Sequence, residues 1–132
     1  MVRAALRKLS ASEKRLYKLY EKVLTIARTE KAVAEGVSFD LMYVNGQYHR
    51  QYAFMRKAGS DVLLVIANFE DQSRRLGVTI PSHAFDFLEL KEKNAQATEL
   101  MTGEKLKLSL KRDVAVNIEV APYGAAIIKF KA

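Results

Sequence analysis

The chain of 132 residues has no cysteine and no tryptophan, and it contains only two histidines and two prolines. Without cysteine it forms no disulfide, no thiolate zinc site and no cysteine nucleophile. No apolar run approaches the roughly 20 residues that a membrane-spanning helix needs, so we expect no membrane partner. The start, MVRAALRKLSASEK, has no continuous apolar centre of the kind found in secretion signals. The remaining composition, 49% hydrophobic and 28% charged, is typical of one soluble globular domain.

The net charge of +7 is concentrated near the N-terminus, where residues 1–35 hold nine Lys or Arg against four Glu and so carry +5. Asymmetry of this kind can mark a nucleic-acid-binding arm. These basic residues, however, are not interleaved with aromatic residues that could stack on bases, and no groove-entering motif is present. A solvated helix face is therefore the preferred interpretation. We expect no nucleic-acid partner and keep nucleic-acid binding as an alternative function.

Residues 10–36 are predicted to form one helix. Ser10 and Glu13 fit a capping box at its start, and Gly36 is expected to end it in the left-handed conformation. Tyr17 and Leu24 lie beside the main apolar stripe and indicate a second apolar contact with a neighbour outside this chain. The stripe itself recurs at helical spacing and consists of Leu16, Leu19, Tyr20, Val23, Ile26 and Ala27.

After Gly36 the hydrophobic period changes from 3.6 to 2, and residues 37–132 are predicted to be one compact antiparallel β-sandwich of the Greek-key type with about eight strands. Asn45-Gly46 predicts a tight hairpin turn, because both residues tolerate positive φ. Val62–Phe69 is apolar on both faces and predicts a central strand that is covered on both sides. Further strands are expected in RLGVTIP, AFDFLEL, ATELM, LKLSL, VAVNIEV and AAIIKF.

The residues that usually carry chemistry do not form a recognisable group. His49 and His83 have no second histidine or carboxylate at metal-ligand spacing, so both are interpreted as solvent-facing and no metal or cofactor is expected. GxSxG, P-loop and GxGxxG sequences are absent. Glu70 and Asp71 lie in a polar turn, where we expect hydrated carboxylates of ordinary acidity, whereas a general acid needs a desolvated one. We therefore expect this chain to have no catalytic residues.

Tyrosine is the residue type that could bind sugar. Exposed aromatic rings stack on the apolar faces of pyranose rings, so Tyr43, Tyr48 and Tyr123 are candidate carbohydrate-binding residues. Tyrosine is also common at the rim of a sheet, and packing there is the preferred interpretation. Starch or glucan binding through these tyrosines stays an alternative function.

In their order and spacing, these segments resemble the C-terminal end of an α-amylase-family glycoside hydrolase. In that family the last helix of a catalytic (β/α)₈ barrel leads into an antiparallel sandwich called domain C. LYKLYEKVLTIARTEKAVAEG resembles the last barrel helix, and VLLVIANFED resembles the central sandwich strand. YAFMR, ATELMTGE and VNIEVAPYGAAIIKF resemble the first hairpin, a late turn and the closing strands. The resemblance covers about residues 12–131.

The resemblance implies that residues 1–36 match the end of a barrel and that residues 37–132 are domain C. The family's three catalytic carboxylates belong to earlier barrel segments, and this sequence has no Arg-x-Asp pair or His-Asp dipeptide. The implied function is that of a non-catalytic, stabilising domain of an enzyme hydrolysing α-glucans such as starch and maltodextrin. Tyr17 and Leu24 would dock on the catalytic barrel, or would form a weak homodimer of the isolated chain. The compartment stays open, and a secreted or periplasmic parent enzyme is compatible with this interpretation.

Overall fold

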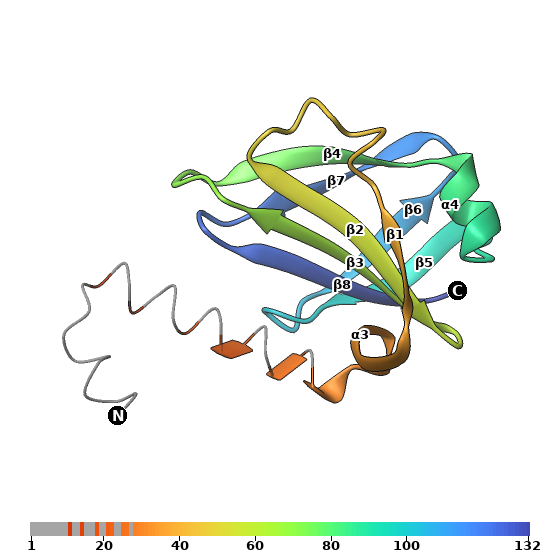
Figure 1. The fold of residues 1–132 in the computed structure, drawn as a ribbon, viewed down its shortest axis with the longest axis horizontal. Helices are drawn as coiled ribbons and strands as arrows, with labels where there is room; N and C mark the ends of the chain where they lie inside the picture. Colours follow the sequence, from red (N-terminus) through yellow and green to blue (C-terminus); the bar gives the residue numbers. More distant parts are fainter. Residues whose placement is uncertain (1–10, 12–13, 15–17, 19–20, 23–24, 27) are drawn as a thin grey trace.

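The described residues of the N-terminal part of the chain are mostly helical. The structure is a computed structural model that describes residues 11, 14, 18, 21–22, 25–26 and 28–132. The described residues up to Thr29 are helical, Glu30 is extended (φ −87°, ψ 119°), and the short helix α3 follows at Lys31–Glu35 (Figure 1). The predicted helix is thus interrupted at Glu30 instead of running unbroken to Gly36. The predicted cap, Ser10 and Glu13, lies outside the described residues.

The rest of the described chain forms two antiparallel sheets that pack as a β-sandwich (Figure 1). One sheet has six strands in the order β1-β2-β3-β8-β5-β6, and the other pairs β4 with β7. This confirms the predicted fold class. The strands are β1 Val37–Asp40, β2 Gln51–Ala58, β3 Asp61–Asn68, β4 Arg74–Ile80, β5 Lys93–Glu99, β6 Lys105–Leu110, β7 Val114–Val120 and β8 Ala125–Lys131.

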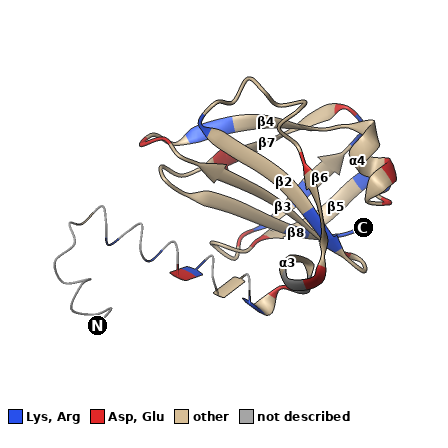
Figure 2. Cartoon of the chain, viewed as in Figure 1, with Lys and Arg blue, Asp and Glu red and all other residues tan. Residues whose placement is uncertain are grey.

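The main core lies between the two sheets, where alternate residues of each strand meet. Met55 of β2, Leu64 of β3 and Ile128 of β8 face Val78 of β4 and Ile118 of β7 in one buried cluster. Because side chains alternate between the faces of a strand, the other residues of β2, β3 and β8 lie on the opposite face of the six-stranded sheet. Figure 2 shows that charged residues lie mainly near the ends of these strands.

The central strand β3 is fully covered on its inner face, whereas its outer face, which the sequence predicted to be covered as well, is fully buried only at Leu63; Val65 and Ala67 are half-buried there. Leu64 is fully buried in the main core, and Leu63 is fully buried on the other side. Leu63 packs in a second cluster with Ile26 of the N-terminal helical segment, Ala32 of α3 and Ile127 of β8. The helical segment and the sandwich therefore share apolar contacts.

The predicted two-residue turn at Asn45-Gly46 is wrong. β1 and β2 do pair as an antiparallel hairpin, but residues 41–50 form a longer loop between them. Asn45 is buried: its amide nitrogen donates to the carbonyls of Leu41 (2.7 Å) and Thr79 (3.0 Å), and its Oδ1 accepts from the Thr79 amide (2.9 Å). The side-chain amide of Asn45 therefore forms the pair of hydrogen bonds with the backbone of Thr79 in β4 that a neighbouring strand would form.

The segment AFDFLEL is also not a strand. It lies in the helix α4 (Ser82–Phe87) and the residues after it, which connect β4 to β5. The Asp113 carboxylate binds the start of α4, accepting hydrogen bonds from the Ser82 amide (2.9 Å) and the Ser82 hydroxyl (2.8 Å). Phe85 and Leu88 are buried. Their three-residue spacing is compatible with one face of a helix, whereas the short apolar run that contains them is also compatible with a buried strand.

Gly36 does not adopt the predicted left-handed conformation. Its backbone is extended (φ −78°, ψ 165°). A Cβ atom at this position would lie 2.0 Å from the carbonyl oxygen of Ala32 and 2.9 Å from that of Lys57. Glycine is therefore needed here for a close backbone approach between α3 and β2, and not for its positive φ.

Candidate functional site

Glu70 is the centre of a polar network where β2, β3 and β4 meet. The side-chain amide of Gln51 donates to Glu70 Oε1 (2.9 Å), and Arg74 donates from Nε (2.9 Å) and Nη2 (2.6 Å) to Oε2. The hydrogen bond from Gln51, followed by those from Arg74, lowers the pKa of Glu70. With its side chain only 17% exposed, Glu70 is not the hydrated carboxylate of ordinary acidity that the sequence predicted.

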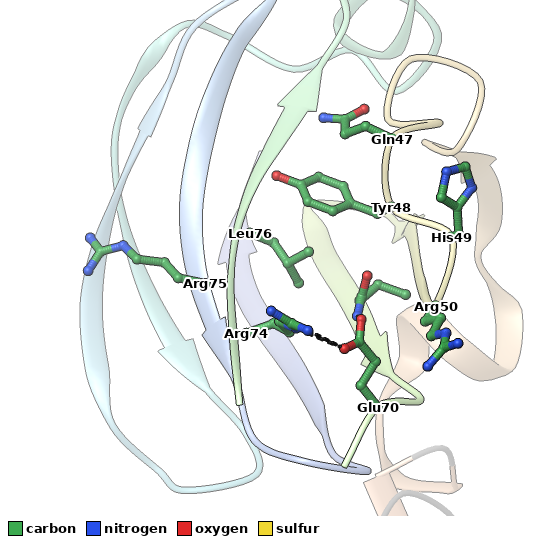
Figure 3. A pocket seen from close by; sticks show the side chains of 9 residues that line it. Gln47, Tyr48, His49, Arg50, Glu70, Arg74, Arg75 and Leu76 are labelled. Carbon is green, nitrogen blue, oxygen red and sulfur yellow. Dashed lines mark hydrogen bonds and ion pairs between the residues drawn. The ribbon is translucent and has the colours of Figure 1, made fainter. Parts of the chain in front are cut away.

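Glu70 and Arg74 line a surface pocket of about 350 Å³ (Figure 3). Tyr48 spans it, and the phenol oxygen of Tyr48 accepts a hydrogen bond from the Gly77 amide of β4 (2.9 Å). In Figure 3 Arg75 points away from the other labelled side chains. The full lining consists of Gln47, Tyr48, His49, Arg50, Gln51, Glu70, Arg74, Arg75 and Leu76.

The pocket is equipped to bind a polar group but not to hydrolyse a glycosidic bond. Hydrolysis uses two carboxylates, one of which must be protonated to act as an acid. The pocket lining holds a single carboxylate, Glu70, and its hydrogen bonds keep it ionised. Within the part of the chain that the structure describes, no group of three His, Cys, Asp or Glu could hold a metal ion, and no helix is long and apolar enough to cross a membrane.

The three candidate tyrosines lie in three different settings. Tyr43 is 60% exposed in the β1–β2 loop, Tyr48 is half-buried in the pocket, and Tyr123 is 52% exposed in the β7–β8 turn. Tyr123 has a positive φ of 46°, and its amide donates to the Glu70 carbonyl (2.9 Å). A sugar-binding role of any of them stays a prediction. Tyr17 and Leu24, the predicted docking residues, lie outside the described residues.

Four aromatic side chains from distant parts of the sequence meet beside β1, and we call them the ring group: Phe39, Tyr43, His83 and Phe87. Phe39 lies at the centre, with ring centroids 6.1 Å from Tyr43, 5.4 Å from His83 and 5.7 Å from Phe87. Sequence reasoning missed this group because it treated His83 as isolated and placed Phe87 on a strand. No local pattern connects residue 39 with residues 83 and 87.

The six-stranded sheet presents a second apolar surface on its outer face. There the strand registers align Tyr52 with Ala67 and Ala125, and Phe54 with Val65 and Ile127. Ile127 is buried, and the others are half-buried or exposed, with Tyr52 at 42%. We call these partly exposed residues the outer rows: Tyr52, Phe54, Val65, Ala67 and Ala125.

The outer rows continue into a row that the chain itself covers. In that next row Arg56, Leu63 and Lys129 are aligned. The Arg56 guanidinium donates to the carbonyls of Ala32 (3.0 Å), Val33 (2.8 Å) and Gly36 (2.7 Å), so it satisfies carbonyls at the end of α3. Lys129 pairs with Glu30 (2.7 Å), and its hydrogen bond with that carboxylate raises the pKa of Lys129. The described residues of the N-terminal segment thus cover one end of an apolar face, and the outer rows lie beyond the part that these residues cover.

Comparison with known proteins gives matches at the level of structure. No family model and no curated protein matches the sequence. The structure is similar to a maltogenic α-amylase, AmyB from Thermotoga neapolitana, with a TM-score of 0.61 and 13% identity over 88% of this chain and 25% of AmyB.

Two further α-amylase structures match over a similar part of this chain. AmyP in complex with maltose matches with a TM-score of 0.60 and 15% identity over 92% of this chain and 22% of AmyP. The α-amylase from Geobacillus thermoleovorans, complexed with acarbose, matches with a TM-score of 0.59 and 11% identity over 84% of this chain and 22% of that enzyme. This chain thus has the fold of a small part of these α-amylases, and it spans a quarter or less of their length.

Proposed function

We propose that this chain is a non-catalytic accessory domain of an α-amylase-family enzyme that hydrolyses α-glucans, and that it stabilises the enzyme by packing against its catalytic barrel. One observation carries the proposal: 84–92% of the chain matches 22–25% of three α-amylase structures. Because the chain corresponds to so small a part of these enzymes, it is best explained as one domain of such an enzyme. The pocket beside Glu70 supports a non-catalytic role, since its lining holds a single carboxylate where glycoside hydrolysis uses two.

The outer rows are the surface best suited to contact the barrel. They are apolar, partly exposed and continuous with the row that α3 and Ile26 already cover. Apolar burial contributes about 25 cal/mol per Å², so a docked face of a few hundred Å² would contribute several kcal/mol before ordering costs. Tyr17 and Leu24, which the sequence predicts to lie on the preceding helix, would extend this contact.

Deletion of the sandwich from the whole enzyme tests the proposal. We expect an enzyme lacking residues 37–132 to have a lower melting temperature and lower solubility, with little change in kcat on a short soluble maltooligosaccharide. The reason is that the lost surface packs and does not react. Differential scanning calorimetry and initial rates measured well below the melting temperature check the two expectations. Full thermal stability after the deletion would contradict the stabilising role.

A further inference from the structure

We propose that the ring group is a carbohydrate-binding platform that holds a stretch of α-glucan chain against the β1 edge of the sandwich. The choice of α-glucan rests on the proposed function, whereas the presence of a sugar platform rests on the geometry of the four rings. The first observation is their exposure. Tyr43 and Phe87 are 60% and 53% exposed although both lie against Phe39, and a contiguous exposed apolar patch can mark a binding surface.

The rings are held in fixed positions before any ligand arrives. Phe39 packs against the main core, and His83 meets it edge-to-face at an interplanar angle of 88°. The interplanar angle is 60° between the rings of Tyr43 and Phe39, and 46° between those of Phe87 and Phe39. A central ring therefore sets the spacing of two exposed rings, so little side-chain entropy would be lost when a ligand stacks on them.

The helix that carries His83 and Phe87 is fastened at both ends. Asp113 binds Ser82 at its start, as described above. Arg112 pairs with Asp86 (2.8 Å), donates to the Ser82 carbonyl (3.1 Å) and lies over the Phe85 ring, 5.2 Å from its centroid. The β6–β7 turn therefore holds α4 in place beside β1, and the platform is built on rigid elements.

A hollow of about 240 Å³ continues the platform beyond Phe87. It is lined by Phe87 and Val37, both 53% exposed, and by the polar side chains of Lys57 and Glu89. An apolar ring next to hydrogen-bonding groups suits a pyranose, which has an apolar face and a rim of hydroxyls. A purely apolar protein segment would leave the Glu89 carboxylate unmatched. The combination favours a sugar chain as the occupant.

The ring group and the outer rows lie on opposite faces of the six-stranded sheet. Phe39 is aligned with Met55, which points into the main core, whereas the neighbouring Phe54 points outward. An enzyme barrel docked on the outer rows would therefore leave the ring group open to solvent. The domain could hold a glucan chain and stabilise the enzyme at the same time.

Affinity electrophoresis of the 132-residue chain in native gels cast with soluble starch tests this proposal. We expect starch to retard the chain, and we expect Tyr43→Ala and Phe87→Ala each to weaken the interaction about tenfold, the loss expected for one stacked ring. Tyr52→Ala is the matched control, because it removes an exposed ring from the opposite face. Circular dichroism checks that each variant is folded. Absence of retardation, or equal losses in Tyr52→Ala, would overturn the proposal.

Titration with maltoheptaose, followed by ¹H–¹⁵N NMR, locates the site independently of the variants. We expect shift changes at residues 39, 43, 83, 87 and 89 and none at residues 52 and 54. Equal changes with cellohexaose would contradict the choice of α-glucan. The starch and NMR experiments test the sugar platform, and the deletion experiment tests the stabilising function. The two results are independent, since an enzyme could lose stability on deletion while the isolated chain shows no affinity for starch.

Discussion

At the scale of single residues, buried amides and one carboxylate connect the two sheets. Asn68 is 1% exposed; its Nδ2 donates to the carbonyls of Gln72 (2.9 Å) and Ala121 (3.1 Å), and its Oδ1 accepts from Gln51 (3.0 Å). Gln51 in turn donates to Glu70. Buried polar groups are rarely left without partners, and here their partners come from both sheets and the β7–β8 turn. The network therefore fixes how the strand ends meet.

Glu70 gives a pH-dependent prediction at this scale. Its pKa is lowered in the folded state, first by the hydrogen bond from Gln51 and then by those from Arg74. A carboxylate of this kind adds stability above its unfolded pKa, and that stability is lost as the pH falls through the folded value. We expect Glu70→Gln to lower the free energy of unfolding at pH 7, and we expect this difference to shrink as the pH falls below about 4.5.

Urea unfolding at a series of pH values measures this effect. Glu104→Gln serves as the control, because Glu104 is an exposed carboxylate in the β5–β6 turn. A difference between Glu70→Gln and the unmodified chain that stayed constant down to pH 2 would show that the network does not depend on the charge of Glu70.

At the scale of elements, the junction between α3 and the sandwich depends on very close packing. The Arg56 guanidinium binds three carbonyls of the segment 32–36. Gly36 lies so close to Ala32 and Lys57 that it leaves no room for a side chain. The end of α3 is therefore fixed by its contacts with β2, and not by a residue in the left-handed conformation.

This packing predicts different effects on stability for two glycine substitutions. In Gly36→Ala the new methyl group would meet the backbone of Ala32 at 2.0 Å, so we expect a loss of about 1–3 kcal/mol in the free energy of unfolding. In Gly46→Ala the nearest atom is 3.7 Å away, so we expect a change within about 0.5 kcal/mol. Thermal and urea unfolding of both variants check this. Equal stability of the two would contradict the packing argument.

At the scale of the whole molecule, the sandwich presents two apolar surfaces on opposite faces. The outer rows are aliphatic and aromatic, lie flat on a sheet and adjoin the N-terminal segment. The ring group is aromatic, lies at a sheet edge and adjoins a small polar hollow. The first surface suits a large protein contact, and the second suits a narrow chain-like ligand. Two surfaces of different character support two separate roles.

One pair of substitutions separates these roles in the proposed parent enzyme. Tyr52→Asp places a charge in the proposed docking surface, so we expect it to lower the stability of the enzyme by at least about 2 kcal/mol, because an unpaired charge would be buried. Tyr43→Asp places the same charge on the opposite face, and we expect little change in stability. Scanning calorimetry compares the two, and the isolated variant chains show whether each change affects the sandwich itself. An equal effect of both substitutions would argue against docking through the outer rows.

Local patterns in the sequence were sufficient to predict most of the sandwich. Val116, Ile118 and Val120 alternate with exposed residues and are buried in β7, as expected for the predicted strand VAVNIEV. In β3, Leu64 and Ile66 are buried in the main core and Leu63 is buried on the opposite face. These features follow from the alternation of side chains along a strand, which acts over a few residues.

The tertiary structure alone decided the features whose partners are distant in the chain. Asn45 binds Thr79 instead of forming a two-residue hairpin turn, Asp113 holds the start of α4 where a strand was predicted, and Glu70 has its pKa lowered by Gln51 and Arg74. The ring group likewise exists only because the fold brings α4 beside β1. The sequence by itself determined most of the strands and the class of fold, because hydrophobic periodicity is local. The surfaces to which we assign function depend on contacts between distant segments, and those contacts form only when the two sheets close on each other.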